Sequence, residues 1–156
     1  MDDNIVDENN NQDNKTIGLE EAKDIALKEV NNRNGVIVDY ELEGTWNNYT
    51  HHDFEIQLDN EKREVKVDAK TGDVVETESK QNNHKIADYD KYIGFDKARD
   101  IAIDNMKDKN DVITELDLEN HNKENKGAYY KVEIHTENGE YDIKIDAESG
   151  KVISRE

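Results

Sequence analysis

The side chains best suited to chemistry gather at residues 49–53, where the sequence reads Tyr-Thr-His-His-Asp. Catalysis needs a nucleophile or a metal beside an oriented base, and this is the only dense polar cluster with histidine. Neighbouring side chains on a strand point to opposite faces, so His51 shares a face with Asp53 but not with His52. Two ligands form an adventitious metal site at best, and the second half of the chain has no matching histidines. We therefore predict a solvated loop, no catalytic residue and no metal site.

Two aspartates recur in similar surroundings, Asp68 followed by Gly72 and Asp146 followed by Gly150. Such repetition suits calcium, but aspartate also braces turns by accepting hydrogen bonds from nearby backbone N–H groups. We favour turn bracing. The chain has no cysteine, which excludes disulfides and thiolate ligands, and it has no glycine-rich phosphate loop. The sequence therefore predicts no cofactor.

Aromatic residues offer a second kind of site, because tryptophan and tyrosine dominate binding hot spots. Trp46 and Tyr49 fall in the expected loop between the first two strands, and Tyr129 with Tyr130 falls late in the chain. We predict these four as binding residues. The alternative for Trp46 is that it folds over the end of its own core.

Charge limits the partners. Lys and Arg number 21 against 39 Asp and Glu, which gives a net charge of −18. Such a surface repels phosphate backbones and anionic headgroups, so nucleic acid and bare membrane are poor partners. It attracts a basic protein, a cationic peptide or a divalent cation at long range. No apolar run approaches the ~20 residues that span a bilayer, and a chain trimmed of an export or lipid-anchor signal would look the same.

The elements that must position these residues form an internal repeat. Residues 17–27 return as 93–103, and residues 67–75 return as 145–153 with two extra residues in a turn between the matches. Residue types are kept within the elements while the insertion falls in a turn, as expected of a duplicated folded unit. We place a disordered tether at 1–16, the first repeat at 17–76, a linker at 77–92 and the second repeat at 93–156.

Each repeat changes its hydrophobic period once. Apolar residues first recur at helical spacing, and the two stripes are Leu19, Ala22, Ile25, Ala26 and Val30, then Phe95, Ala98, Ile101, Ala102 and Met106. The period then becomes two over several short segments, which is typical of strands with one buried face. We predict an α+β fold of two tandem repeats, each one helix packed on a three- to four-stranded antiparallel sheet.

The helix segment Ile-Gly-Leu-Glu-Glu-Ala, the strands Tyr-Glu-Leu-Glu and Phe-Glu-Ile, and the closing Val-Asp-Ala-Lys-Thr-Gly-Asp-Val-Val resemble the PepSY domain. The resemblance covers residues 17–75 and 93–153. Gly18 and Gly94 stand at the helix caps, where the family often has Ser or Thr. The resemblance implies no catalytic residues, and it implies a bacterial exported protein or lipoprotein that controls a peptidase or restrains another envelope protein.

From charge and resemblance together we predict a non-catalytic, extracytoplasmic binding module with a protein or peptide partner, for example a peptidase that it inhibits. Exposed sheet edges offer an extended peptide a place to add as a strand. The location expected is extracellular or in the cell envelope. The alternative function is binding of calcium, another divalent cation or a cationic ligand through the acidic surface.

Overall fold

The computed structural model describes residues 16–121, 123 and 126–156. Residues 1–15, most of the expected tether, lie outside the described residues. The first repeat contains α1 (Leu19–Glu29), β1 (Val36–Thr45), β2 (Asn48–Leu58), β3 (Glu61–Asp68) and β4 (Val74–Gln81). A 3-10 helix, η2 (Ile86–Tyr89), precedes the second repeat, which contains α2 (Phe95–Asp104), β5 (Val112–Glu119), β6 (Tyr129–Thr136), β7 (Gly139–Asp146) and β8 (Val152–Arg155). The predicted α+β repeats are confirmed, each with four strands.

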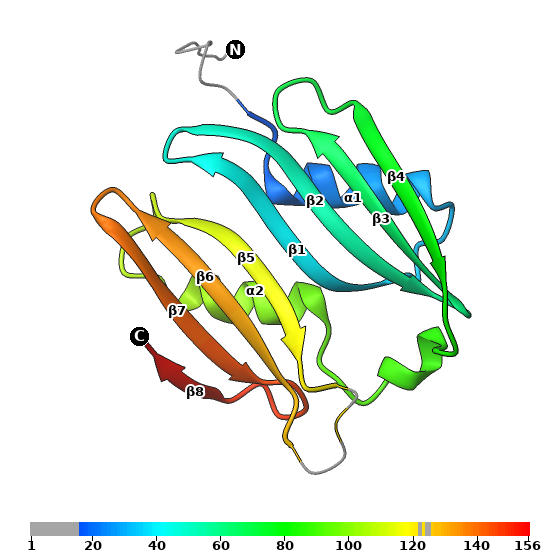
Figure 1. The fold of residues 1–156 in the computed structure, drawn as a ribbon. Coiled ribbons are helices and arrows are strands. Elements are labelled where there is room, and N and C mark those ends of the chain that lie inside the picture. Colours follow the sequence, from blue (N-terminus) through cyan, green and yellow to red (C-terminus); the bar gives the residue numbers. More distant parts are fainter. Residues whose placement is uncertain (1–15, 122, 124–125) are drawn as a thin grey trace.

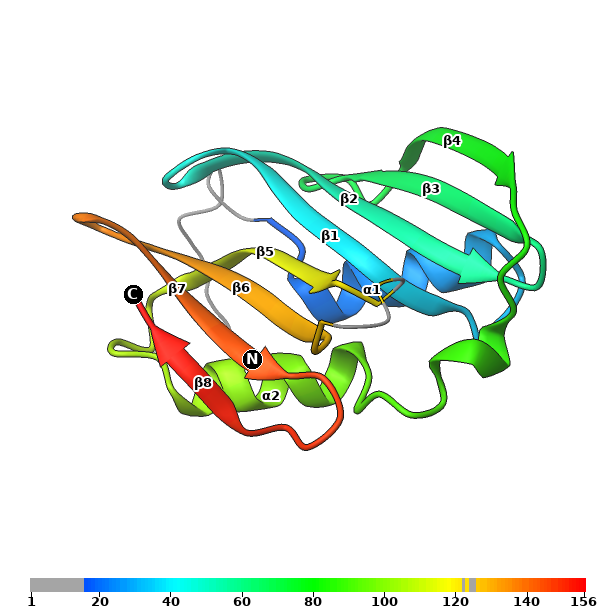
Figure 2. The ribbon, with the colours of Figure 1, turned by 60° about the horizontal axis from the view of Figure 1, so that its bottom comes forward.

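All eight strands form one antiparallel sheet in the order β4-β3-β2-β1-β5-β6-β7-β8 (Figure 1). The repeats therefore join edge to edge through β1 and β5. Both helices lie on the same face of this sheet (Figure 2), and no helix of the described residues lies on the other face. We call the two sides the helix face and the open face.

The junction between the repeats has twofold pseudosymmetry. Tyr40 pairs with Leu116, while Asp39 pairs with Asp117 and Glu41 pairs with Glu115. Leu116 is the counterpart of Tyr40 in the repeat, and exchanging the two repeats also exchanges the other two pairs. The arrangement matches that of a symmetric dimer interface, here contained in one chain.

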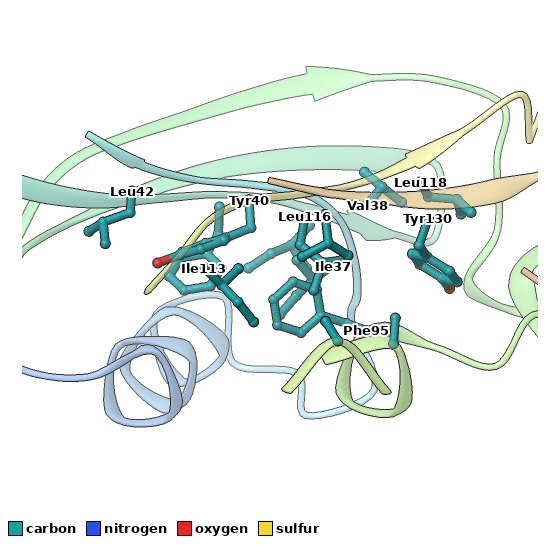
Figure 3. Close-up of a cluster of buried hydrophobic side chains, with 14 of the residues drawn as sticks. Ile37, Val38, Tyr40, Leu42, Phe95, Ile113, Leu116, Leu118 and Tyr130 are labelled. Carbon is teal, nitrogen blue, oxygen red and sulfur yellow. The ribbon is translucent and has the colours of Figure 1, made fainter. Parts of the chain in front are cut away.

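The helix face holds one core that runs across the junction (Figure 3). Four helical alanines have no exposed surface, which allows each helix to lie close to the strands; they are Ala22, Ala26, Ala98 and Ala102. Phe95 of the second repeat packs edge-on against Tyr40 of the first, with 6.0 Å between the ring centroids. Because each repeat buries side chains of the other, we expect the two to unfold together.

The repeated aspartates brace turns, as predicted. Asp68 Oδ1 accepts hydrogen bonds from the backbone N–H groups of Lys70 and Thr71 at 2.8 and 2.9 Å. Asp146 accepts the equivalent bonds in the second repeat. These backbone bonds lower the pKa of both carboxyls. Gly72, with φ of 79°, supplies the left-handed residue that closes the first turn.

Two expectations about loops are wrong. The expected loop at residues 44–53 is a long hairpin, because β1 and β2 meet at a two-residue turn of Trp46 and Asn47. The polar His52 occupies an inward position, which hid the strand pattern. In addition, β4 continues to Gln81, so the first part of the expected linker is strand.

His52 is not in a solvated loop. Its side chain is buried on the helix face, where Nδ1 lies 2.8 Å from the Tyr40 hydroxyl and Nε2 lies 3.0 Å from the carbonyl oxygen of Ile17. Burial lowers the pKa of His52. This histidine therefore ties the segment before α1 to the sheet, while the adjacent His51 faces the other way, as predicted.

Candidate functional site

The open face carries a concentration of carboxyl groups around the pseudo-twofold axis. They arise from the alternating positions of four neighbouring strands whose other side chains fill the core. Together they line a hollow of about 230 Å³, and its acidic members are Asp39, Glu41, Asp53, Glu55, Glu64, Glu115 and Asp117. We call this set the carboxylate row.

Members of the row stand directly opposite one another. Across β1 and β5, Asp39 faces Asp117 and Glu41 faces Glu115. On the first repeat's side, Asp39 also pairs with Glu55. Opposed side chains in neighbouring antiparallel strands lie about 5 Å apart, and like charges at that distance destabilise the sheet.

Proton binding relieves part of this repulsion. Burial, a hydrogen bond to Glu115 and the charge of Asp39 together raise the pKa of Asp117 to about 9. Burial beside Glu64 likewise raises the pKa of Asp53 to about 8. The pKa of Asp39 rises to about 7 through burial and its contact with Glu55. The raised pKa values of these three carboxyls therefore favour proton binding in the row near neutral pH.

Lysines at the margin of the row neutralise only part of its charge. Lys62 Nζ lies 3.4 Å from Glu55 of the row, and Lys66 Nζ lies 3.4 Å from Glu43, which is outside the row. Among the described residues, Glu41 and Glu115 at the centre of the row form no ion pair within 4 Å, although the charge of Glu115 raises the pKa of Lys131 on β6. The row can thus attract a positive group and exchange protons with it.

Two groups on the sheet bring possible metal ligands within 4.8 Å of one another, and one of them shares Glu64 with the carboxylate row. Glu133, His135 and Glu140 form the first group, and Glu64, Glu76 and Glu78 form the second. Carboxylate oxygens are the ligands that calcium prefers. Both groups are at least partly exposed, and acidic side chains often lie this close together without holding an ion.

The predicted aromatic residues do not meet at one place. Trp46 is partly exposed in the β1–β2 turn, and Tyr49 is buried nearby on the helix face with its hydroxyl 3.4 Å from His135 Nδ1. At the opposite end of the sheet, Tyr129 lies under Lys144, whose Nζ is 5.3 Å from the ring centroid. Tyr130 is in the core, and its hydroxyl accepts the backbone N–H of Gly94 at 3.1 Å.

Sequence reasoning missed the carboxylate row, although its signal was present. Acidic residues alternate with apolar ones in each contributing strand, as in Asp39-Tyr40-Glu41-Leu42 and Glu115-Leu116-Asp117-Leu118. The pairing of β1 with β5 brings these stretches together. That pairing joins two repeats and could not be inferred from either alone.

Neither α1 nor α2 is long or apolar enough to cross a membrane, and the same holds for every helix in the described part of the chain. Among curated proteins, none matches this chain significantly. A crystal structure of a Clostridium difficile 630 protein described as a lipoprotein is similar, with 25% sequence identity and a TM-score of 0.51. The match covers 90% of this chain and 92% of that one.

The C-terminal domain of Bacillus megaterium YpeB also matches, with 16% identity and a TM-score of 0.32 over 90% of this chain and 65% of that one. The family described as "Peptidase propeptide and YPEB domain" matches the chain twice, at residues 16–78 and 92–156. These two ranges correspond to the two repeats of the fold. The chain therefore belongs to the PepSY family, with two of its domains joined in one sheet.

Proposed function

We propose that this protein is a non-catalytic binding module of the cell envelope that restrains a peptidase or another envelope protein. The observation that carries the proposal is the carboxylate row, which spans both repeats on the face that neither helix covers. A basic surface of the partner docks there.

Family membership supports the regulatory part of the proposal. The family's name links these domains to peptidase propeptides and to YpeB. The similar protein from Clostridium difficile is described as a lipoprotein, which supports a place in the envelope for this chain as well.

Electrostatics explains why a basic partner would be selected. Opposite charge speeds encounter and penalises the wrong partners, and both effects weaken as salt is added. A bound Lys or Arg also favours the ionised form of Asp39, Asp53 and Asp117, whose pKa values are raised in the free protein. Binding therefore releases protons near neutral pH.

Cross-linking with the full chain as bait in an envelope fraction of the source organism tests the proposal. The test variant is Asp39→Asn with Glu41→Gln and Asp117→Asn. The matched control removes three exposed acids from α1 instead, through Glu21→Gln with Asp24→Asn and Glu29→Gln.

The proposal predicts that wild type and control capture the same partner and reduce its activity, while the row variant captures at least about tenfold less. If the row variant and the α1 control capture equal amounts of the partner, the carboxylate row is not the docking surface. A captured partner whose activity is unchanged by wild type would remove the regulatory role.

Binding of a divalent cation is the second candidate, and the two clusters of possible ligands favour it. If calcium binds the folded chain, the melting temperature rises with calcium concentration and falls again with chelator. The variant Glu76→Gln with Glu78→Gln should abolish the part of this rise that comes from the second cluster. A melting temperature that is indifferent to millimolar calcium would exclude this candidate.

A further inference from the structure

Two grooves lie between the helices and the sheet, and the pseudo-twofold axis exchanges them. One has a volume of about 750 Å³ and is lined by residues 93–96 together with Lys23 and Leu27. The other, of about 710 Å³, is lined by the counterparts of these residues, namely 17–20, Arg99 and Ile103. We call the first the linker groove and the second the open groove.

Ion pairs between the helices separate the two grooves. Lys23 Nζ lies 2.7 Å from Asp96, and Arg99 forms the symmetric ion pair with Glu20. Lys23 and Arg99 are counterparts in the repeat, as are Glu20 and Asp96. The two grooves are therefore built to the same plan, and their differences are informative.

The linker groove is walled on one side by the chain's own η2 helix. Ile86 packs against the core, and Tyr89 is 7% exposed with its pKa raised to about 12 by burial. The β2–β3 turn holds this segment in place, since Asp59 Oδ1 accepts the N–H of Ile86 at 2.9 Å and Asn60 donates to the carbonyl of His84 at 2.7 Å. The wall of this groove thus presents one aliphatic and one aromatic side chain, three positions apart on a short helical turn.

The open groove has no such wall among the described residues. Ile103 on its rim is 49% exposed, whereas its counterpart Leu27 in the linker groove is partly buried. Met106 is likewise only partly buried, while its counterpart Val30 is 8% exposed. Other apolar residues that line the open groove are Ile17, Leu19, Leu42, Tyr49 and Ile113.

We propose that the open groove binds a short helical turn of the partner protein, with an aliphatic and an aromatic side chain three positions apart and Lys or Arg beside them. This inference rests on the proposed function and specifies a second contact, on the opposite face from the carboxylate row. The hydrophobic pair follows from the segment that walls the equivalent groove.

The basic flanks follow from charge. Three acids, Glu20, Asp100 and Asp111, line the groove with two bases, Arg99 and Lys109, which leaves one negative charge in excess. The chain as a whole carries −18. A positive segment is therefore attracted to this side of the molecule too.

A peptide of residues 82–92 is the probe, because it contains the Ile86 and Tyr89 pair with Lys85 and Lys91 beside it. It is titrated into the isotope-labelled full chain while backbone chemical shifts are followed. A second probe carries Asp90→Lys, and a control peptide carries Ile86→Ser with Tyr89→Ser.

We expect shifts centred on residues 17–20 and 103–113, tighter binding of the Asp90→Lys probe and no binding of the control peptide. The variant Ile103→Ser should weaken binding about tenfold or more. Ile153→Ser is the matched control, since Ile153 is 57% exposed and lies outside both grooves, and it should bind as wild type does. Because both side chains are exposed, both variants should fold.

Several results would overturn the inference. No shifts up to about 1 mM peptide, shifts elsewhere, or equal loss in both variants would remove the groove as a site. A dimer that dissociates on Ile103→Ser would make a second copy the occupant. Peptide binding that appears only after deletion of residues 1–15 would make that segment the occupant. If the row variant loses partner capture but Ile103→Ser does not, the open groove is not a contact for the partner, while the proposed function is retained.

Discussion

The same strands form both faces of this sheet, and the two faces differ in character: one packs apolar side chains and the other presents carboxyl groups. On the helix face, alternate residues such as Phe54 and Ile143 are fully buried and stabilise the fold. On the open face, the side chains that alternate with the apolar ones along the strands place like charges opposite one another, as at Asp39 and Asp117. A sheet selected for stability alone would not keep such pairs. The open face therefore carries an electrostatic cost that the helix face does not, as expected of a binding surface.

The largest difference between the faces should appear on truncation to alanine. Phe54→Ala removes a side chain with no exposed surface, and we expect it to lower the free energy of unfolding by about 3–5 kcal/mol. Glu41→Ala, thirteen residues earlier on the open face, should change it by less than about 0.5 kcal/mol or raise it. Urea denaturation of both variants checks this, and equal losses would erase the distinction.

A smaller effect is expected from the polar group on the helix face. His52→Ala leaves the buried Tyr40 hydroxyl without its partner, which should cost about 1–3 kcal/mol. The folded-state pKa of His52 is lowered, so its neutral form contributes stability at neutral pH that is lost as the pH falls below about 6.5. Thermal melts between pH 5 and 7 should show this decline in wild type, and a variant with the same decline would contradict the assignment.

The open face should respond to pH in the opposite direction. The pKa values of Asp53 and Asp117 are raised to about 8 and 9, so their contribution is fully present only below the unfolded-state pKa of about 3.9 and is lost as the pH rises from there through the folded-state values. Asp117→Asn should therefore raise the melting temperature by about 3 °C at pH 9 and leave it nearly unchanged at about pH 4. An increase of the same size at both pH values would show that Asp117 is ionised throughout.

The smallest effect should come from the turns. Asp68→Asn keeps one acceptor for the N–H groups of Lys70 and Thr71 but removes the charge that strengthens those bonds. We expect a loss of about 0.5 kcal/mol at pH 7, fading below pH 4 because the folded-state pKa of Asp68 is lowered. The same change at Asp146 should behave alike, and a larger loss in only one repeat would argue against their equivalence.

The fold was largely predictable from the sequence because its signals are local. Helical spacing at Leu19, Ala22 and Ala26 and the duplicated turns at Asp68 and Asp146 mark the elements directly. The strand residues at 44–53 were wrongly predicted as a loop because polar His52 points inward at a position where a strand pattern has an apolar residue. Its partners, Tyr40 and the carbonyl of Ile17, are distant in the chain and could not be assigned in advance.

The candidate site was less predictable, since it depends on contacts between repeats. The alternating acids of 39–43 and 115–119 were readable, but their convergence requires the antiparallel pairing of β1 with β5. The predicted binding residues were chosen by type alone; they are Trp46, Tyr49, Tyr129 and Tyr130. Only Tyr49 lines a groove, and its role in binding stays a prediction.

Proton release on binding tests the central account most directly. A lysine-rich peptide is titrated into the full chain at pH 7.5 by calorimetry in two buffers of different ionisation enthalpy. The variant with Asp39, Asp53 and Asp117 each changed to Asn serves as comparison. If the open face is a partly protonated surface that binds cations, wild type releases about one proton or more per peptide and the variant releases nearly none. Binding without proton release, or equal release by the variant, would contradict it.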